Sequence, residues 1–166
     1  MARALSECGV ERVQVKWPND VVADFRKLAG ILVETSGEIQ GPSAAVIGVG
    51  VNYRLGERLL ERIDQPVTDV WQCAPSPPSR STLLARLLGS LASALDAFER
   101  QGFAASRDAW RAMHAYQGRR VRVMPAHDKP FDAEVVDVAL DGALVVACPD
   151  GRTVSLSSAE ISLRGK

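Results

Sequence analysis

The sequence has no excess charge of either sign, because 20 lysine and arginine residues balance 20 aspartate and glutamate residues among its 166 residues. This balance excludes an overall basic field of the kind that holds nucleic acid or an anionic membrane surface, so any affinity for phosphate must be local. The sequence also has no apolar run of transmembrane length and no basic start followed by an apolar stretch. We therefore predict neither a membrane span nor a secretory signal, and expect a soluble cytoplasmic protein.

Cysteine and histidine are scarce. The three cysteines, Cys8, Cys73 and Cys148, are widely spaced and form no CxxC or Cys/His pattern. His114 and His127 have no partner at metal-ligand spacing, and we interpret them as a helix-end and a loop residue. The sequence therefore predicts neither a disulfide framework nor a zinc site, and it suits a reducing compartment.

The first two thirds of the chain predict strands followed by helices. Alternation over 13–17 predicts a strand, and 21–23 with 28–35 predict a hairpin whose polar turn lies at 24–26. After a turn at 37–42, the β-branched run AAVIGVGVNY predicts a core strand covered on both faces.

An irregular Pro/Ser-rich loop over 72–80 precedes the clearest helix of the chain, at 81–102. In that helix the apolar residues recur at helical spacing, which predicts that they face the core: Leu84, Leu87, Leu88, Leu91, Leu95 and Phe98. A shorter helix follows, with Phe103, Trp110 and Met113 on its apolar side.

After Gly118 the hydrophobic period changes to two. Five short strands with Asp-Gly turns in about fifty residues predict a small barrel-like domain with its boundary near residue 117. Arg119, Arg120 and Arg122 are interpreted as an exposed strand edge, with contact to a carrier protein as the alternative.

Four charged and amide side chains gather at one end of the predicted sheet. A lysine such as Lys16 or Lys27 suits phosphate or carboxylate oxygens, and a neighbouring carboxylate such as Asp20 can help to hold Mg²⁺. Asn19 and the later Asn52 can both donate and accept hydrogen bonds at a base edge or a ribose. These are the requirements of a nucleotidyl-transfer site.

Gly48 and Gly50 share one strand face with Asn52 by period two, so a flat ligand can lie on that bare face. Simpler interpretations stay open for each of these residues. The lysines suit a solvated strand end with salt bridges to Asp20 and Asp24, Asn-Asp after Pro18 suits a plain turn, and the glycines suit close packing of a helix.

The segment VKWPNDVVADFRKLAGILVE resembles the KWPND…KLAGILVE signature of biotin protein ligases. The likeness continues through VIGVGVNY and the long helix to AEISLR, which resembles the closing strand of the family's SH3-like C-terminal domain. The resemblance implies an α+β fold. Residues 1–116 are expected to form the latter part of a class II synthetase-like mixed sheet with helices, and residues 117–166 the SH3-like β-barrel domain.

The resemblance also implies an activity. Biotin and ATP, with Mg²⁺, give biotinoyl-5'-adenylate, and biotin then passes to a lysine of the biotin carboxyl carrier domain of a carboxylase. Carried onto this sequence, Lys27 is the catalytic and biotin-binding cation, and Gly30 lets the backbone approach biotin. Because period two puts residues 27 and 30 on opposite faces, their joint contact requires main chain or a bulge.

The nucleotide-binding residues implied by the resemblance are Asn52 at the adenine edge, with Asn19 and Lys16, while Asp20 is implied at the metal. The family carries a glycine- and arginine-rich loop upstream of KWPND, and this sequence has no counterpart of it. We therefore expect this chain alone to be inactive or severely impaired.

Two alternatives follow from that difference and from the family. The chain can be a non-catalytic or split-enzyme module that keeps a biotin, nucleotide or carrier surface, or a lipoyl ligase relative, although the KWPND and KLAGILVE wording argues against lipoate. The family also implies that two copies can pair through sheet surfaces as a homodimer. The sequence shows no N-terminal helix-turn-helix, so DNA binding by this chain is not predicted.

Overall fold

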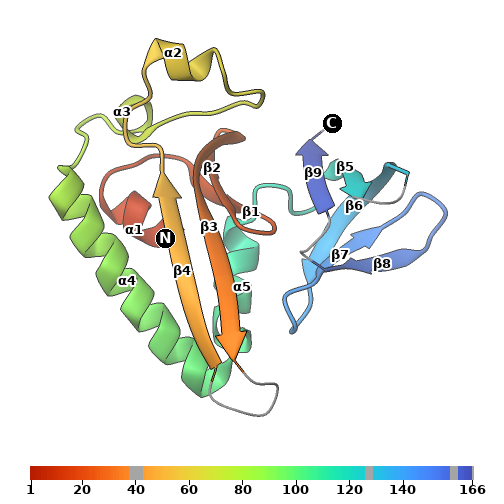
Figure 1. Ribbon diagram of the computed structural model, residues 1–166. Coiled ribbons are helices and arrows are strands. Elements are labelled where there is room, and N and C mark those ends of the chain that lie inside the picture. Colours follow the sequence, from red (N-terminus) through yellow and green to blue (C-terminus); the bar gives the residue numbers. More distant parts are fainter. Residues whose placement is uncertain (38–42, 126–128, 158–160, 166) are drawn as a thin grey trace. The chain divides into compact units, whose positions relative to one another are not determined.

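The computed structural model describes residues 1–37, 43–125, 129–157 and 161–165 (Figure 1). The predicted turn at 37–42 lies largely outside these residues, as do His127 and the start of AEISLR. The chain divides into two compact units, Met1–Gln14 with Asn19–Leu87, and Val15–Pro18 with Leu88–Lys166. The predicted division into residues 1–116 and 117–166 stays a prediction. Within the described residues, no helix is long and apolar enough to cross a membrane.

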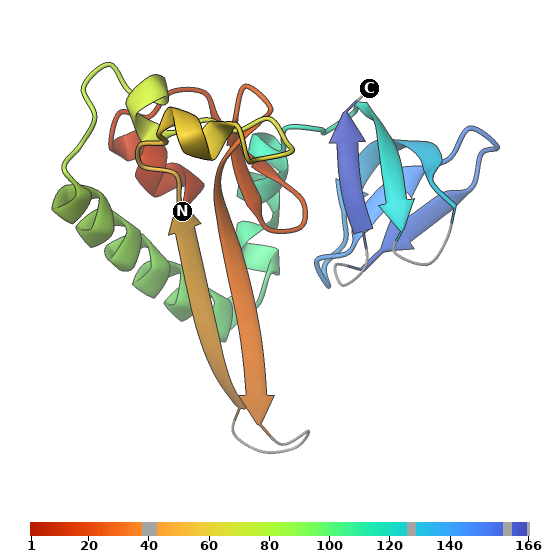
Figure 2. The same ribbon diagram turned by 45° about the horizontal axis from the view of Figure 1, so that its top comes forward.

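A four-stranded sheet in the order β1-β2-β3-β4 carries the signature segment. Its strands are β1 (Val13–Lys16), β2 (Asp20–Ala23), β3 (Arg26–Gly37) and β4 (Ser43–Val51). The predicted hairpin is confirmed, since β2 pairs antiparallel with β3, and β3 then pairs antiparallel with β4 over nine residue pairs. Figures 1 and 2 show β3 and β4 as two long strands that lie side by side and run in opposite directions; together they are called the β3–β4 ribbon. The fully buried side chains of the first unit include Val22 and Leu28 of the sheet, together with Leu5 and Val70.

The turn between β2 and β3 consists of two left-handed residues. Asp24 has φ 49° and Phe25 has φ 60°, as in the two-residue turns that match the twist of a hairpin. The Asp24 carboxylate also pairs with Arg12 at 2.8 Å. This tight turn determines which residues of β2 and β3 stand opposite each other.

The prediction that β4 is covered on both faces is wrong for this chain. β4 is an edge strand of its sheet, and Val46 and Val49 are 65% and 43% exposed. On the neighbouring β3, Leu32 and Val33 are also more than half exposed. The run is apolar enough for a central strand, but no described strand pairs with its outer edge.

Short helices complete the first unit. They are α1 (Ala2–Glu7), α2 (Glu57–Leu60) and α3 (Val70–Cys73), and α3 extends into the stretch predicted as a loop. The Asp69 side chain caps α3 by accepting from the Gln72 N–H at 2.8 Å.

The long helix α4 (Arg80–Gln101) forms where it is predicted, and α5 (Ala104–Met113) follows it. The predicted orientation of α4 is right only in part. Leu84, Leu88, Leu95 and Phe98 are 47–61% exposed, whereas Leu87 and Leu91 are half-buried. Leu83 is the buried residue of α4, and Leu83, Leu87 and Leu91 recur every four residues, so the inner face lies along one side of the predicted leucine stripe. Spacing alone does not show which side of such a stripe is covered.

The second unit ends in the five predicted strands. They are β5 (Arg120–Pro125), β6 (Phe131–Val138), β7 (Leu144–Ala147), β8 (Thr153–Leu156) and β9 (Ile161–Gly165). They form an antiparallel sheet in the order β8-β7-β6-β5-β9 (Figure 2). Its core consists of alternating residues: Val121, Val123, Val135, Val138, Leu144 and Val146, each at most 1% exposed. The α+β class with a small C-terminal β domain is confirmed.

Candidate functional site

Lys27, Asp20 and Gly30 come together on one face of the β2–β3 ribbon. The Lys27 Nζ lies 2.6 Å from the Asp20 Oδ1, and Asp20 pairs directly with Gly30. A Cβ placed on Gly30 would lie 3.5 Å from Asp20 Oδ1 and 3.6 Å from Lys27 Nζ. The glycine therefore keeps a side-chain position next to the ammonium group open.

A register shift brings Lys27 and Gly30 to the same face. Val21 pairs with Ala29, whereas Val22 pairs with Lys27, so one extra residue stands on β3 between the two pairs. An extra residue of this kind inverts the alternation of side chains along a strand. The bulge that the sequence could only name as one alternative is thus present.

The backbone of Lys27 is held on both sides by a segment about 40 residues further along the chain. The Lys27 N–H donates to the Pro66 carbonyl at 2.9 Å, and the Thr68 N–H donates to the Lys27 carbonyl at 3.0 Å. Thr68 and Asp69 are buried polar residues, 0% and 2% exposed. The sequence interpretation missed this segment, although an Asp three positions before Gln72 is a helix-cap signal.

Asn52 links the same groups. Its Nδ2 donates to the carbonyls of Lys27 and Thr68, both at 3.1 Å. Its backbone donates to Leu28 and accepts from Val70, each at 2.9 Å. Because both amide hydrogens are donated within the protein, only the side-chain oxygen of Asn52 can take a further partner.

Glycines extend the open strip beyond Gly30. Gly30 stands directly opposite Gly50, and Leu32 opposite Gly48, so these positions share one face of the ribbon. No described atom lies within 4 Å of a Cβ built on Gly50. Helix packing against this glycine is therefore not seen, and a flat bare strip lies beside the Lys27 side chain.

Asn19 borders the strip from β2. The Asn19 Nδ2 donates to the Ile31 backbone carbonyl at 2.8 Å, and the Asn19 backbone carbonyl accepts from the Ile31 N–H at 2.9 Å. Lys16 is the last residue of β1 and belongs to the second unit, and its predicted role in nucleotide binding stays a prediction.

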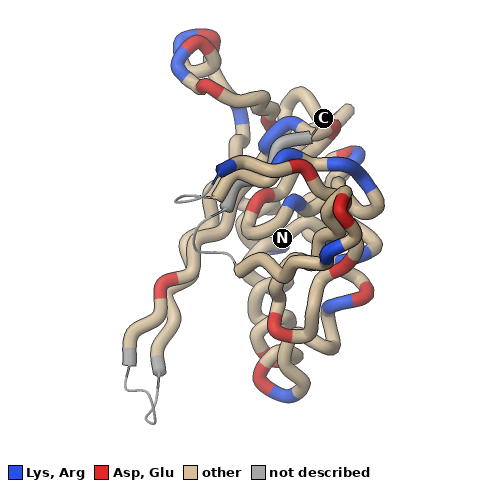
Figure 3. Tube along the Cα trace, turned by 90° about the vertical axis from the view of Figure 1, so that its right-hand side faces the viewer, with Lys and Arg blue, Asp and Glu red and all other residues tan. Residues whose placement is uncertain are grey.

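Figure 3 shows almost no charge on the outer part of the β3–β4 ribbon, where Glu34 is the charged residue among 28–37 and 43–51. Charge is thus concentrated at the Lys27 end.

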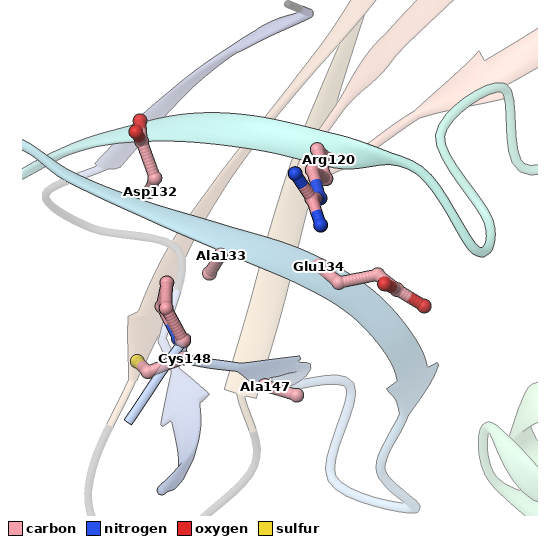
Figure 4. Close-up of a pocket in the computed structure, with 7 residues that line it drawn as sticks. Arg120, Asp132, Ala133, Glu134, Ala147 and Cys148 are labelled. Atoms are coloured by element: carbon pink, nitrogen blue, oxygen red, sulfur yellow. The ribbon is translucent and has the colours of Figure 1, made fainter. Parts of the chain in front are cut away.

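A pocket with a volume of about 270 Å³ lies in the C-terminal sheet (Figure 4). Arg120 on β5 and Glu134 on β6 stand opposite each other in the strand register at its rim, and Cys148 lines its other side. The neighbouring Arg122 pairs with Asp132 at 3.0 Å. β5 is an internal strand, so these arginines lie on a sheet face and not on an edge.

Two family models match the chain. Residues 1–52 match the biotin/lipoate A/B protein ligase family, and residues 116–164 match the biotin protein ligase C-terminal domain. The chain is 35% identical over 164 residues to the bifunctional ligase/repressor BirA of Escherichia coli, covering 99% of this chain and 50% of that protein. It is 32% identical over 167 residues to a biotin--[acetyl-CoA-carboxylase] ligase of Paracoccus denitrificans, covering 95% and 66%.

The fold is similar to that of a biotin protein ligase from Aquifex aeolicus solved in complex with biotin and ATP. The TM-score is 0.80 at 21% identity, covering 99% of this chain and 67% of that one. At that identity the similarity establishes the fold. The chain spans about half the length of BirA and about two thirds of the other two proteins.

Proposed function

The chain belongs to the biotin protein ligase family, and on this premise we propose that it takes part in the ATP-dependent attachment of biotin to a lysine of a carboxylase carrier domain. In the first step a biotin carboxylate oxygen bonds to the α-phosphorus of ATP, and the bond to pyrophosphate breaks. Biotinoyl-5'-adenylate results. In the second step the carrier lysine amine bonds to the acyl carbon, and AMP and a proton leave.

The observation that carries this proposal is the ammonium group of Lys27 beside the bare glycine strip. Both steps develop or move negative charge on carboxylate and phosphate oxygens, and a fixed cation stabilises such charge. Lys27 is fixed by its ion pair with Asp20 and by its backbone bonds to the 66–68 segment. Gly30 then provides the space in which biotin approaches the backbone.

Asn52 supports the nucleotide part of the proposal in a changed form. With both amide hydrogens donated to Lys27 and Thr68, its oxygen can accept from the exocyclic amino group of adenine. A guanine presents a carbonyl at that place, so this arrangement favours ATP over GTP. Asn19 and Lys16 are proposed at the phosphates.

Mg²⁺ is proposed as an ion that arrives with the phosphates. Mg²⁺ sites of this kind commonly use one or two carboxylates together with substrate phosphates, and Asp20 is one such carboxylate. The described residues hold no cluster of three His, Cys, Asp or Glu side chains that would bind a metal without a substrate. Asp20 is therefore proposed as a ligand that the ion shares with the substrate phosphates.

Biotin is favoured over lipoate by the C-terminal match. The N-terminal model covers both biotin and lipoate ligases, whereas residues 116–164 match a domain of biotin protein ligases. The test is exchange of labelled pyrophosphate into ATP, with biotin or lipoate as the acid. Exchange that depends on lipoate and not on biotin would overturn the proposal.

A second candidate function is favoured by the exposed apolar residues of β3 and β4. Leu32, Val33 and Val46 are 54–65% exposed, and neighbouring exposed apolar residues of this kind are typical of an interaction surface. On this alternative the chain is a module that binds biotin, nucleotide or carrier and does not ligate alone. Isothermal titration separates the two, because a module binds biotin or ATP without pyrophosphate exchange. Full ligation by the isolated chain would contradict the module and our expectation of impaired activity.

A further inference from the structure

Trp17, the second residue of the KWPND segment, has no part in the proposed function, yet it is 3% exposed. Its indole Nε1–H donates to the backbone carbonyl of Gly142 at 3.1 Å, across 125 positions of the sequence. Both residues belong to the second unit, which contains Val15–Pro18 and the C-terminal sheet. Part of the signature is thus held by a turn of that sheet.

The backbone next to Trp17 is held by the end of α5. The Ala115 N–H donates to the Val15 carbonyl at 2.9 Å, and Val15 and His114 form a parallel bridge. The Trp17 N–H faces the His114 Nε2 at 3.4 Å, and the His114 ring stacks on Trp110 with centroids 4.6 Å apart. Val15 and Trp17 are therefore fixed at two places, by α5 and by Gly142.

The direction of the Gly142 carbonyl is set by a tight turn between β6 and β7. The Ala139 N–H donates to the Ala143 carbonyl at 2.8 Å, and the Gly142 N–H donates to the Ala139 carbonyl at 3.0 Å. The Ala143 N–H donates to the Asp141 Oδ1 at 3.0 Å. Gly142 has φ 86°, a conformation that a residue with a Cβ adopts only with strain.

We propose that Trp17 is a positioning residue through which this turn of the C-terminal sheet holds the Asn19-Asp20 segment, and so the Asp20–Lys27 pair. Pro18 alone separates Trp17 from Asn19, so a displacement of Trp17 is passed on to Asn19 through two peptide units. The importance of the Asp20–Lys27 pair for ligands rests on the proposed function. Ligand binding there and the order of the β6–β7 turn are then linked in both directions.

Two glycines provide a matched test. Gly142 and Gly151 have φ values of 86° and 85°, lie in consecutive hairpin turns of one sheet, and have no described atom within 4 Å of an added Cβ. Gly142→Ala and Gly151→Ala therefore add the same strain. Of these two glycines, Gly142 is the one whose carbonyl accepts a hydrogen bond from the Trp17 indole among the described contacts.

The first measurement uses ¹⁵N-labelled full chain without ligand. The chain has three tryptophans, and Trp17→Phe identifies the Trp17 indole signal by its loss. We expect Gly142→Ala to shift the Trp17 indole signal and the backbone signals of Asn19 and Asp20, and Gly151→Ala to leave all three in place. Equal shifts in both variants, or no shift in Gly142→Ala, would overturn the inference. If Trp17→Phe does not fold, selective labelling assigns the signal and the two glycine variants still decide.

The second measurement is titration with a stable sulfamoyl analogue of biotinoyl-5'-adenylate, at a temperature where each variant is fully folded. Gly142→Ala is expected to bind about 2- to 12-fold more weakly, the equivalent of one net hydrogen bond, and Gly151→Ala as the unmodified chain does. A residue that only stabilises the fold would leave this affinity unchanged, and that result overturns the positioning role. If the analogue does not bind the unmodified chain, the proposed function fails, while the ligand-free spectra still decide whether Trp17 positions Asn19 and Asp20.

Discussion

The stability of the second unit should depend on pH through His114, and His114→Phe should remove that dependence. His114 is 4% exposed, and its burial lowers its pKa from 6.5 to about 4. Its Nε2 faces the Trp17 N–H, a donor, which requires the neutral ring at that atom. Phenylalanine keeps an aromatic ring against Trp110 and cannot take up a proton.

The sign and size of the effect follow from the two pKa values. Between pH 6.5 and about 4 the unfolded chain binds a proton at His114 and the folded chain does not. The stabilisation is therefore fully present above pH 6.5 and is lost as the pH falls toward 4. At about 1.4 kcal/mol for each tenfold change in proton affinity, the loss reaches about 3 kcal/mol near pH 4 and about 2 kcal/mol at pH 5.

The assay is urea unfolding of the chain and of His114→Phe at pH 7, 6 and 5, followed by far-ultraviolet circular dichroism. The carboxylates titrate alike in both proteins, so the difference between the two free energies of unfolding isolates His114. A constant offset reflects the lost contact with Trp17 and is subtracted. Curves that run parallel from pH 7 to pH 5 would refute the burial argument.

Three further predictions concern the first unit. Lys27→Ala should weaken binding of the adenylate analogue by about 10- to 100-fold, the equivalent of a charged hydrogen bond, and an unchanged Kd by titration would remove Lys27 from the site. Asn52→Asp should lower the free energy of unfolding by about 2 kcal/mol or more, because the carbonyls of Lys27 and Thr68 lose their donor. As a control in the same urea experiment, Asn19→Asp at an exposed position should lower it by less than half of that amount. The double variant Leu32→Ser, Val46→Ser should change the free energy of unfolding by less than about 1 kcal/mol and reduce self-association measured by light scattering. Val22→Ser, in the core, should instead be strongly destabilising. A loss of several kcal/mol in the double variant would show that the β3–β4 face is buried.

The positions of the elements were largely predictable from the sequence, because each depends on local patterns. Alternation located β1, a polar turn between two apolar stretches located β2 and β3, and a β-branched run located β4. A leucine pattern located α4, and Asp-Gly turns separated the strands of the C-terminal sheet. What covers an element is not a local property. For this reason the sequence predicts β4 as a covered strand and the Leu84–Phe98 stripe as core, whereas β4 carries exposed valines and four of the six stripe residues are exposed.

The site was predictable in its residue types and only partly in its geometry. The signature resemblance identified Lys27, Asp20 and Gly30. Strict alternation, however, places residues 27 and 30 on opposite faces of the strand. The β3 bulge opposite Val21 and Val22, which brings them to one face, is not encoded by any residue that sequence rules recognise. The second partner of Asn52, Thr68, lies in a stretch without regular structure, so no periodicity connects it to Lys27. The two hydrogen bonds that Asn52 donates therefore follow from the folded structure and could not be predicted from the sequence.

The salt bridge and the ligand site, which the sequence offers as alternative interpretations of Lys27, are compatible in the structure. An ammonium group has three N–H donors, and the contact with Asp20 at 2.6 Å uses one of them. The Lys27 side chain is 34% exposed, and its Nζ lies next to the position that Gly30 keeps open. The ion pair thus orients the ammonium group and leaves two donors for a carboxylate or phosphate oxygen. Asp20→Asn should in that case weaken the analogue's binding less than Lys27→Ala does, since the cation remains and only its orientation is lost.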